Sequence, residues 1–320
     1  MTPGAAVSGS SSRSPGRILV IKLGALGDVI LALGPFAAIR RDHPDAHITL
    51  LTTPAFAGLL ESSPYFDEIW AETRVPLWNP AGWLALRRRL RGGDFDRVYD
   101  LQTSDRSGWY FRLMGPGRRP EWSGIATGCS HPHANPRRDF MHSIERQNEQ
   151  LAMAGIGNVP DADLSWMEAD IGRFGLADRY VLLVPGGAPH RPAKRWPTGR
   201  YAALATRLVA AGIQPVLLGT AFEAGIAREI AGGCPGVRDL TGETTIADIA
   251  VLARGAAGAV GNDTGPMHLI AAAGCPSVVL FSGESDPALT APRGASVAVQ
   301  RATDLAALSV ESVEAALSLR

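Results

Sequence analysis

The chain has few cysteines, no excess of charge of either sign and no long apolar run. Its three cysteines, Cys129, Cys234 and Cys275, are spread over 320 residues, too far apart in sequence to indicate a disulfide framework or a zinc motif. Lys plus Arg and Asp plus Glu both number 31, so no basic field points to nucleic acid. No apolar run reaches the ~18 residues of a transmembrane helix. These absences favour a cytoplasmic protein with neither a membrane span nor a nucleic-acid partner.

The first sixteen residues lack the apolar core of a signal peptide. They are rich in Ser, Gly, Pro and Ala and contain a single arginine. We therefore expect residues 1–16 to be a disordered leader outside the fold. The remaining length is enough for about two domains.

Strand-like and helix-like segments alternate along the chain, which is typical of doubly wound parallel sheets. The alternation stops between Pro116 and Arg138, where Gly, Pro, His and Arg dominate as in a long functional loop. It restarts near residue 178, and we place the domain boundary at about 165–178. The expected strands are 17–23, 46–52, 67–70, 95–101, 180–184, 214–219, 237–240, 256–260 and 276–281, and the expected helices are 29–41, 54–60, 80–91, 105–113, 140–154, 198–211, 222–231, 245–254, 269–273 and 304–319.

The predicted fold is α/β, with two Rossmann-like domains that face a cleft. The N-terminal domain covers residues 17–172 and the C-terminal domain residues 173–303. An amphipathic helix at 304–320 follows them.

A tight turn between an apolar run and a helical pattern is the strongest candidate site. Its sequence is Gly261-Asn262-Asp263-Thr264-Gly265-Pro266-Met267-His268. The N-terminus of such a helix favours an anion, and ligands of open α/β sheets bind at this edge. We interpret the turn as a diphosphate site in which the amides of Thr264 and Gly265 hold phosphate and His268 points the same way. Alternatively, Asp263 only caps the helix and His268 is a core histidine.

A second turn, residues 185–197, is rich in Gly and Pro and contains Lys194. This lysine can place its charge on a phosphate oxygen, or it is a surface charge. The spacing of a P-loop is missing. Glu223 follows the strand that ends at Gly219 and suits a ribose hydroxyl pair, or it is a solvated acid at a helix start.

Asp28 follows Gly27 at the carboxyl end of the first strand. It is either a helix-capping acid or a general base that faces the interdomain cleft. Gly24 and Gly27 do not form a dinucleotide fingerprint.

Other patterns give weaker indications. Asp94 with Asp96 and Asp161 with Asp163 have D-x-D spacing, and Cys129 lies near two histidines; neither arrangement predicts a metal site. The run of arginines at 87–89 and 91 indicates a solvated helix face or contact with an anionic membrane surface.

Four motifs, in this order, resemble glycosyltransferase family 9, the ADP-heptose:lipopolysaccharide heptosyltransferase family. They are Lys22-Leu23-Gly24-Ala25-Leu26-Gly27-Asp28-Val29 with Pro35, Asp100-Leu101-Gln102, Lys194-Arg195-Trp196-Pro197, and the turn at 261–268 with Asp286-Pro287. The resemblance implies a GT-B architecture with the acceptor on the N-terminal domain and the nucleotide-sugar on the C-terminal domain. It also implies an inverting transfer without a metal or another cofactor, and a last helix that packs back on the N-terminal domain.

The resemblance also implies roles for single residues. Asp28 matches the catalytic base of the family, and Lys194 matches its phosphate-binding lysine. Gln102 and Arg106 match positions that face the acceptor. The donor-binding turn is matched by Asp263, Thr264, Gly265 and His268, and Glu223 falls near the ribose-binding acid. The segment 116–138 matches no family pattern, so the acceptor stays open.

The expected function is the transfer of heptose or a related sugar from an ADP-sugar to a lipopolysaccharide-core or related saccharide, with peripheral contact at the inner-membrane surface. One alternative is a protein or secondary-metabolite acceptor. The other is a nucleotide-sugar-binding protein without catalysis.

Overall fold

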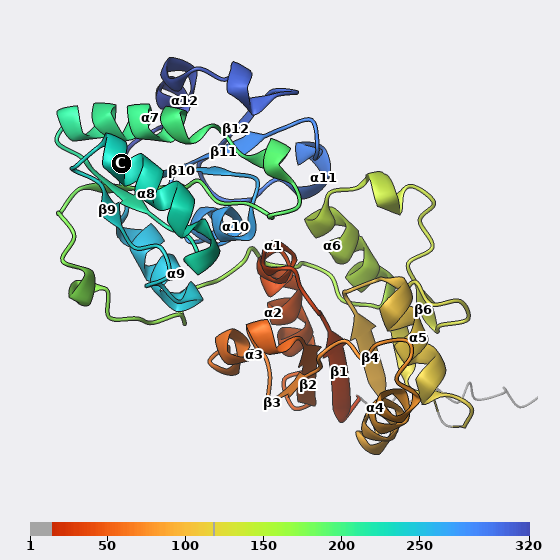
Figure 1. The fold of residues 1–320 in the computed structure, drawn as a ribbon. Coiled ribbons are helices and arrows are strands. Elements are labelled where there is room, and N and C mark those ends of the chain that lie inside the picture. Colours follow the sequence, from red (N-terminus) through yellow and green to blue (C-terminus); the bar gives the residue numbers. More distant parts are fainter. Residues whose placement is uncertain (1–14, 118) are drawn as a thin grey trace, which may run out of the picture.

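The computed structural model describes residues 15–117 and 119–320, so most of the expected leader lies outside the described residues. The chain forms two six-stranded sheets whose strand pairs are parallel (Figure 1). The strand orders are β3-β2-β1-β4-β5-β6 and β12-β11-β10-β7-β8-β9. Each order reverses beside the first strand of its half, β1 or β7, which is the doubly wound arrangement. The predicted fold class is confirmed.

The N-terminal sheet is covered on both faces, because Ile18, Leu19, Val20 and Ile21 of its central strand are fully buried. Its elements are β1 (Arg17–Ile21), α1 (Leu26–Ile30), α2 (Leu33–Asp42), β2 (His47–Thr52), α3 (Pro54–Glu61), β3 (Glu68–Ala71), α4 (Pro80–Gly92), β4 (Arg97–Asp100), α5 (Asp105–Met114), β5 (Glu121–Gly124), β6 (His131–Pro132), the 3-10 turn η1 (Arg138–Phe140) and α6 (Ser143–Met153).

The second half repeats this plan after the 3-10 turn η2 (Gly172–Phe174). Its elements are β7 (Tyr180–Val184), η3 (Pro192–Lys194), α7 (Thr198–Ala210), β8 (Gln214–Leu217), η4 (Ala221–Glu223), α8 (Ala224–Gly233), β9 (Arg238–Asp239), α9 (Ile246–Gly255), β10 (Gly258–Asn262), α10 (Gly265–Ala272), β11 (Ser277–Phe281), α11 (Pro287–Thr290), β12 (Val297–Arg301), η5 (Leu305–Ala307) and α12 (Val310–Ala316). None of the helices among the described residues is long and apolar enough to cross a bilayer.

The loop expected between Pro116 and Arg138 is only partly a loop, because it contains β5 and β6. β5 pairs with β4, and β6 pairs with β5. The neighbouring strand supplies the backbone hydrogen bonds, so a segment without a clear apolar pattern still becomes a strand.

The expectation that the last helix packs on the N-terminal domain is wrong. Val310 and Val313 are buried in the core of the C-terminal domain. Arg207 of α7 forms ion pairs with Glu311 and Glu314 of α12. α12 therefore lies on α7, as Figure 1 shows, and it is shorter than the helix expected at 304–319.

The two domains meet where α1 lies against α10 (Figure 1). This contact needs glycine on both sides. A Cβ on Gly27 would lie 2.7 Å from Cδ2 of His268, and a Cβ on Gly265 would lie 2.8 Å from Cβ of Leu26. The contact brings the turn after β1 and the turn after β10 together at the carboxyl edges of their sheets.

Candidate active site

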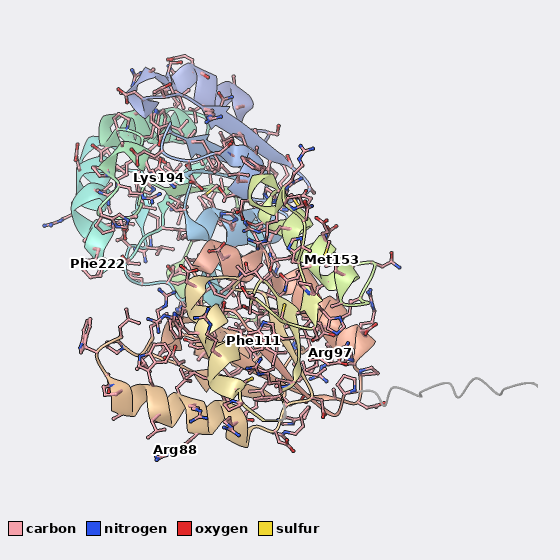
Figure 2. All side chains as sticks on the ribbon, turned by 90° about the vertical axis from the view of Figure 1, so that its right-hand side faces the viewer. Arg88, Arg97, Phe111, Met153, Lys194 and Phe222 are labelled. Carbon is pink, nitrogen blue, oxygen red and sulfur yellow. The ribbon has the colours of Figure 1, made fainter. Side chains whose placement is uncertain are left out.

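A cavity of about 820 Å³ opens at the carboxyl edge of the C-terminal sheet. Its lining comes mainly from the turns after β7, β8, β9 and β10, while Leu26, Ala55 and Phe56 reach it from the N-terminal domain. Phe222 lies at its edge with 90% of the side chain exposed (Figure 2). The volume is that of a small-molecule site, and we call it the donor cavity.

Lys194 and Asp263 form an ion pair in the lining of the donor cavity. Nζ of Lys194 donates to Oδ2 of Asp263 at 2.6 Å, and Oγ of Ser285 donates to the same oxygen at 2.7 Å. The lysine and aspartate side chains are only 13% and 9% exposed. A lysine ammonium has three N–H groups, so Lys194 keeps donors for an incoming anion.

The N-terminus of α10 lies in the same wall. Thr264 is its N-cap, Gly265 is its first residue, and Pro266 occupies the first turn, where proline is favoured. All three line the donor cavity. The first N–H groups of a helix have no intrahelical partner, and the dipole is positive there. The wall therefore offers N–H donors from both Lys194 and the start of the helix.

Asn262 connects the two glycine-rich turns, and the sequence motif gave it no role of its own. Its Nδ2 donates to the carbonyls of Pro185 and Gly186 at 2.8 and 3.0 Å. Its Oδ1 accepts from the backbone N–H of Trp196 and from the hydroxyl of Tyr201. Asn262 is fully buried, so it fixes the loop that carries Lys194 relative to α10.

Glu223 lines the donor cavity and also caps η4. Its Oε2 accepts from the backbone N–H of Thr220 at 2.8 Å and from the hydroxyl of the same residue at 2.5 Å. Glu223 therefore lies at a helix start, as its alternative interpretation expected, but it is half-buried and bonded to Thr220 rather than solvated, and the ribose contact stays a prediction.

His268 does not line the donor cavity. Its ring packs against Gly27 and borders a separate cavity of about 560 Å³ behind the α1–α10 contact. Burial lowers the pKa of His268 to about 4, so the ring is neutral at pH 7. The structure gives His268 a packing position at the contact between α1 and α10, and its expected contact with the donor stays a prediction.

Asp28 lines a third cavity, of about 250 Å³, on the N-terminal domain. Its Oδ2 accepts from the backbone N–H of Ala25 at 3.1 Å, so the capping role is confirmed. Leu26, two residues earlier, lines the donor cavity instead. The short helix α1 therefore separates the two cavities, and Asp28 faces the second one, which we call the acceptor cavity.

Two buried ionisable side chains lie at the ends of neighbouring strands, Lys22 directly after β1 and Asp100 at the end of β4, and Lys22 also lines the acceptor cavity. Nζ of Lys22 donates to the carbonyl of Leu101 at 3.0 Å, and burial lowers the pKa of this lysine. Asp100 accepts from the backbone N–H groups of Gln102 and Thr103, and burial raises the pKa of its carboxyl to about 6. These contacts fix the end of β4 beside the turn that carries Asp28.

Two arginines in the lining of the acceptor cavity were not identified from the sequence. Burial lowers the pKa of Arg146, and the charge of Arg138 lowers it further. Nη2 of Arg138 is buried and has no hydrogen-bond partner among the described residues, although its Nη1 pairs with Asp139. Two partly dehydrated cations beside Asp28 suit a ligand that carries an anionic group. Arg138 ends the segment 116–138, which matches no family pattern, and Arg146 lies in the helix expected at 140–154, for which no site role was predicted.

The two expected acceptor residues occupy different places. Gln102 lines the acceptor cavity, and its Oε1 accepts from the N–H of Leu23 at 2.8 Å. Arg106 instead donates to the carbonyl of Val75 at 3.1 Å and stacks on Trp83. Its contacts support a neighbouring loop rather than the cavity around Asp28.

Cys129, His131 and His133 do not gather around a common point. Among residues 15–117 and 119–320, no group of three His, Cys, Asp or Glu side chains is arranged to hold a metal ion.

Comparison with known proteins identifies the family. A family model described as glycosyltransferase family 9 (heptosyltransferase) matches residues 83–316. The chain is 28% identical to lipopolysaccharide heptosyltransferase 2 of Escherichia coli, over 86% of this chain and 85% of that protein. It is 32% identical to lipooligosaccharide heptosyltransferase 2 of Haemophilus influenzae, again over 86% and 85%.

A solved structure agrees in fold. The E. coli heptosyltransferase WaaC with ADP superposes with a TM-score of 0.76 at 22% identity, over 93% of this chain and 98% of that one. The chain therefore belongs to glycosyltransferase family 9, the heptosyltransferases, and is a glycosyltransferase with the two-domain GT-B fold.

Proposed function

We propose that the protein transfers heptose from ADP-heptose, with inversion, to a saccharide of the lipopolysaccharide core. The observation that carries the proposal is the position of α1 between two cavities. Leu26 lines the donor cavity and Asp28 lines the acceptor cavity. A base in this position can act on a hydroxyl that approaches a donor sugar from the side opposite its diphosphate.

The donor cavity has two chemically different parts. Lys194 and the N-terminus of α10 suit the diphosphate. Val184, Leu218 and Ile246 contribute apolar side chains elsewhere in the lining and suit a nucleobase. Adenine in particular is supported by the relatives, which are named heptosyltransferases, and by the related structure that holds ADP.

The reaction follows from these positions. Asp28 takes the proton of the acceptor hydroxyl while the hydroxyl oxygen attacks the anomeric carbon. The bond from that carbon to the diphosphate oxygen breaks on the opposite face, and its electron pair leaves with ADP. Lys194 and the amides at Thr264 and Gly265 stabilise the charge that develops on the diphosphate.

The acceptor cavity supports an acidic saccharide as the acceptor. Arg138 and Arg146 place two guanidinium groups in the same cavity as Asp28, and a carboxylate or phosphate on the acceptor would reduce their mutual repulsion. The cytoplasmic location and contact with the membrane surface also stay part of the proposal.

Nucleotide selectivity and product stereochemistry test the proposal. ADP at about 100 times its dissociation constant should stabilise the protein by about 2.7 kcal/mol, while UDP, GDP and CMP should give smaller shifts in melting temperature. NMR of the product should show that the anomeric configuration of the donor is inverted. Equal shifts with all nucleotides, or a retained configuration, would contradict the corresponding part of the proposal.

A further inference from the structure

Two neighbouring apolar side chains on the N-terminal domain are almost fully exposed. Leu77 and Trp78, in the loop between β3 and α4, are 76% and 85% exposed. They line neither the donor nor the acceptor cavity. We call this pair the tip. Adjacent large apolar side chains in water mark an interaction surface when they continue into a larger patch.

The base of the loop is held in place, so the exposure of the tip is built into the fold. The carbonyl of Val75 accepts from Nη1 of Arg106 at 3.1 Å. The carbonyl of Pro76 accepts from Nε1 of Trp83 at 3.0 Å. These bonds fix the backbone immediately before the tip, on the side of α4 and α5. Folding the tip back onto the domain would require that they break.

The helix that follows the tip in sequence, α4, also has exposed side chains on one of its sides. Leu84, Arg88 and Arg91 recur four and three residues apart, so they share one side of the helix. Leu84 is 44% exposed, and both arginines are exposed. Figure 2 shows Arg88 at the lower edge of the N-terminal domain, on the helix that bounds it. The face is apolar near the tip and basic toward the end of the helix.

Acidic side chains are almost absent from this segment. Residues 72–93 contain five arginines and one acid, Glu72. Glu72 is buried and accepts from the hydroxyl of Tyr110 at 2.9 Å. Tryptophan beside leucine, followed by exposed arginines on the next helix, matches the interface of a bilayer that contains anionic lipids. An acidic protein partner would pair with the arginines, but its binding would not require the exposed apolar side chains of the tip.

We propose that the tip, together with Arg88 and Arg91, docks the enzyme on an anionic lipid bilayer. Nη2 of Arg74, in the same loop, donates to the carbonyl of Leu23 at 3.3 Å, at the start of the turn that carries Asp28. A docked tip therefore holds the catalytic turn close to the lipid surface. The biological role of this docking rests on the proposed function, because a lipid-linked acceptor would reach Asp28 from that surface.

The test measures binding of the full chain to vesicles, with neither donor nor acceptor present. The wild type should sediment with phosphatidylcholine vesicles that contain phosphatidylglycerol, and more weakly with phosphatidylcholine alone. Leu77→Ser with Trp78→Ser should lower the partition about tenfold or more. Arg88→Gln with Arg91→Gln should lower it about tenfold at low salt and remove most of its salt dependence.

Two control variants match these changes in chemistry but lie elsewhere. Phe140→Ser replaces another exposed aromatic side chain, 80% exposed, and Arg179→Gln with Arg228→Gln removes two exposed arginines of the C-terminal domain. Both controls should bind vesicles like the wild type.

Three results would overturn the docking proposal. They are a wild type that does not sediment, a tip variant that sediments like the wild type, and controls that lose binding as strongly as the tip variant. A tip variant that loses turnover equally on a water-soluble deacylated acceptor would show instead that the tip contacts the acceptor. Because vesicle binding needs no substrate, its failure leaves the proposed transfer reaction separately testable.

Discussion

At the scale of single residues, Lys194 in its ion pair with Asp263 has two effects, one on ligand binding and one on the stability of the fold. These two effects need separate measurements. The ammonium of Lys194 is the group we assign to the diphosphate. The Asp263 carboxylate is only 9% exposed and relies on Lys194 and Ser285 for its partners. Removing the lysine alone therefore leaves a poorly hydrated charge, which is destabilising whether or not a ligand binds.

We predict that Lys194→Ala weakens ADP binding about 10- to 100-fold, because charge-assisted hydrogen bonds are lost. The same variant should unfold at a lower temperature than the wild type. The double variant Lys194→Ala with Asp263→Asn should regain most of this stability and none of the ADP affinity. Isothermal titration and thermal unfolding measure the two quantities. Recovery of affinity in the double variant would mean that Lys194 serves the fold rather than the donor.

His268 gives a second prediction at this scale, in the dependence of stability on pH. Its pKa in the folded protein is about 4, below the 6.5 of an ordinary histidine, because of burial. Between these values the unfolded state binds the proton and the folded state does not. The free energy of unfolding therefore rises with pH in this window. The contribution of neutral His268 to stability is fully present above about pH 6.5 and is lost as the pH falls toward 4. The largest contribution is about 3 kcal/mol.

We expect His268→Gln to flatten the pH dependence of urea unfolding between pH 4 and 6.5 relative to the wild type. His190→Gln, which replaces an exposed histidine, is the matched control. A His268→Gln profile as steep as that of the wild type would place the titrating group elsewhere.

At the scale of secondary-structure elements, the contact between α1 and α10 depends on the absence of side chains. A Cβ on Gly265 would lie 2.8 Å from Cβ of Leu26 and 3.3 Å from the backbone nitrogen of Gly27. These atoms belong to the element that carries Asp28 and cannot rotate away. Any side chain at position 265 must push the two helices, and therefore the two cavities, apart.

Gly265→Ala should destabilise the protein by about 1–3 kcal/mol, as overpacking does, and should lower turnover because the donor site moves away from Asp28. Gly225→Ala in α8 is the control, since its Cβ would meet nothing within 4 Å. That control should be neutral or stabilising by up to about 1 kcal/mol, because alanine is the better helix former. Thermal unfolding and initial rates compare the two variants.

Elements with their own apolar pattern could be predicted from the sequence, and elements that depend on a neighbour could not. The segment at 17–23 contains the apolar run 18–21, and β1 (Arg17–Ile21) forms there. β5, with the sequence Glu-Trp-Ser-Gly, has no such pattern and becomes a strand by pairing with β4. β12 has valines at the alternating positions 297 and 299. It lies at the edge of the sheet beside β11, and it is not among the strands expected from the sequence.

The residues of the candidate site also differ in whether the sequence could identify them. Lys194 and Asp28 lie in glycine-rich turns directly after strands, and the sequence places such turns at one edge of a sheet. Arg138 ends the segment 116–138 and Arg146 lies in the helix α6, and neither is part of a recognised motif. They join Asp28 in one cavity only because β5, β6 and α6 return the chain to that edge. The position of His268 also depends on packing, because it is set by the contact with Gly27.

At the scale of the whole molecule, the proposed catalysis depends on each domain binding a different substrate. The C-terminal domain contributes most of the donor cavity, and the N-terminal domain contributes Asp28 with the acceptor cavity. α6 adds a second connection between the domains, because Nε2 of His142 lies 2.9 Å from the carbonyl of Ala291. On the proposed function, donor binding and chemistry depend on different domains, and we expect them to separate on mutation.

Asp28→Asn tests this division most directly. The amide keeps the size of the side chain and an oxygen that can accept from Ala25, but it cannot take a proton from the acceptor. We predict that turnover of ADP-heptose with a deacylated core acceptor falls about 10²- to 10⁴-fold. ADP affinity and melting temperature should stay close to those of the wild type. Turnover near the wild-type rate, or an equal loss of turnover and ADP binding, would contradict the assignment of Asp28 as the base.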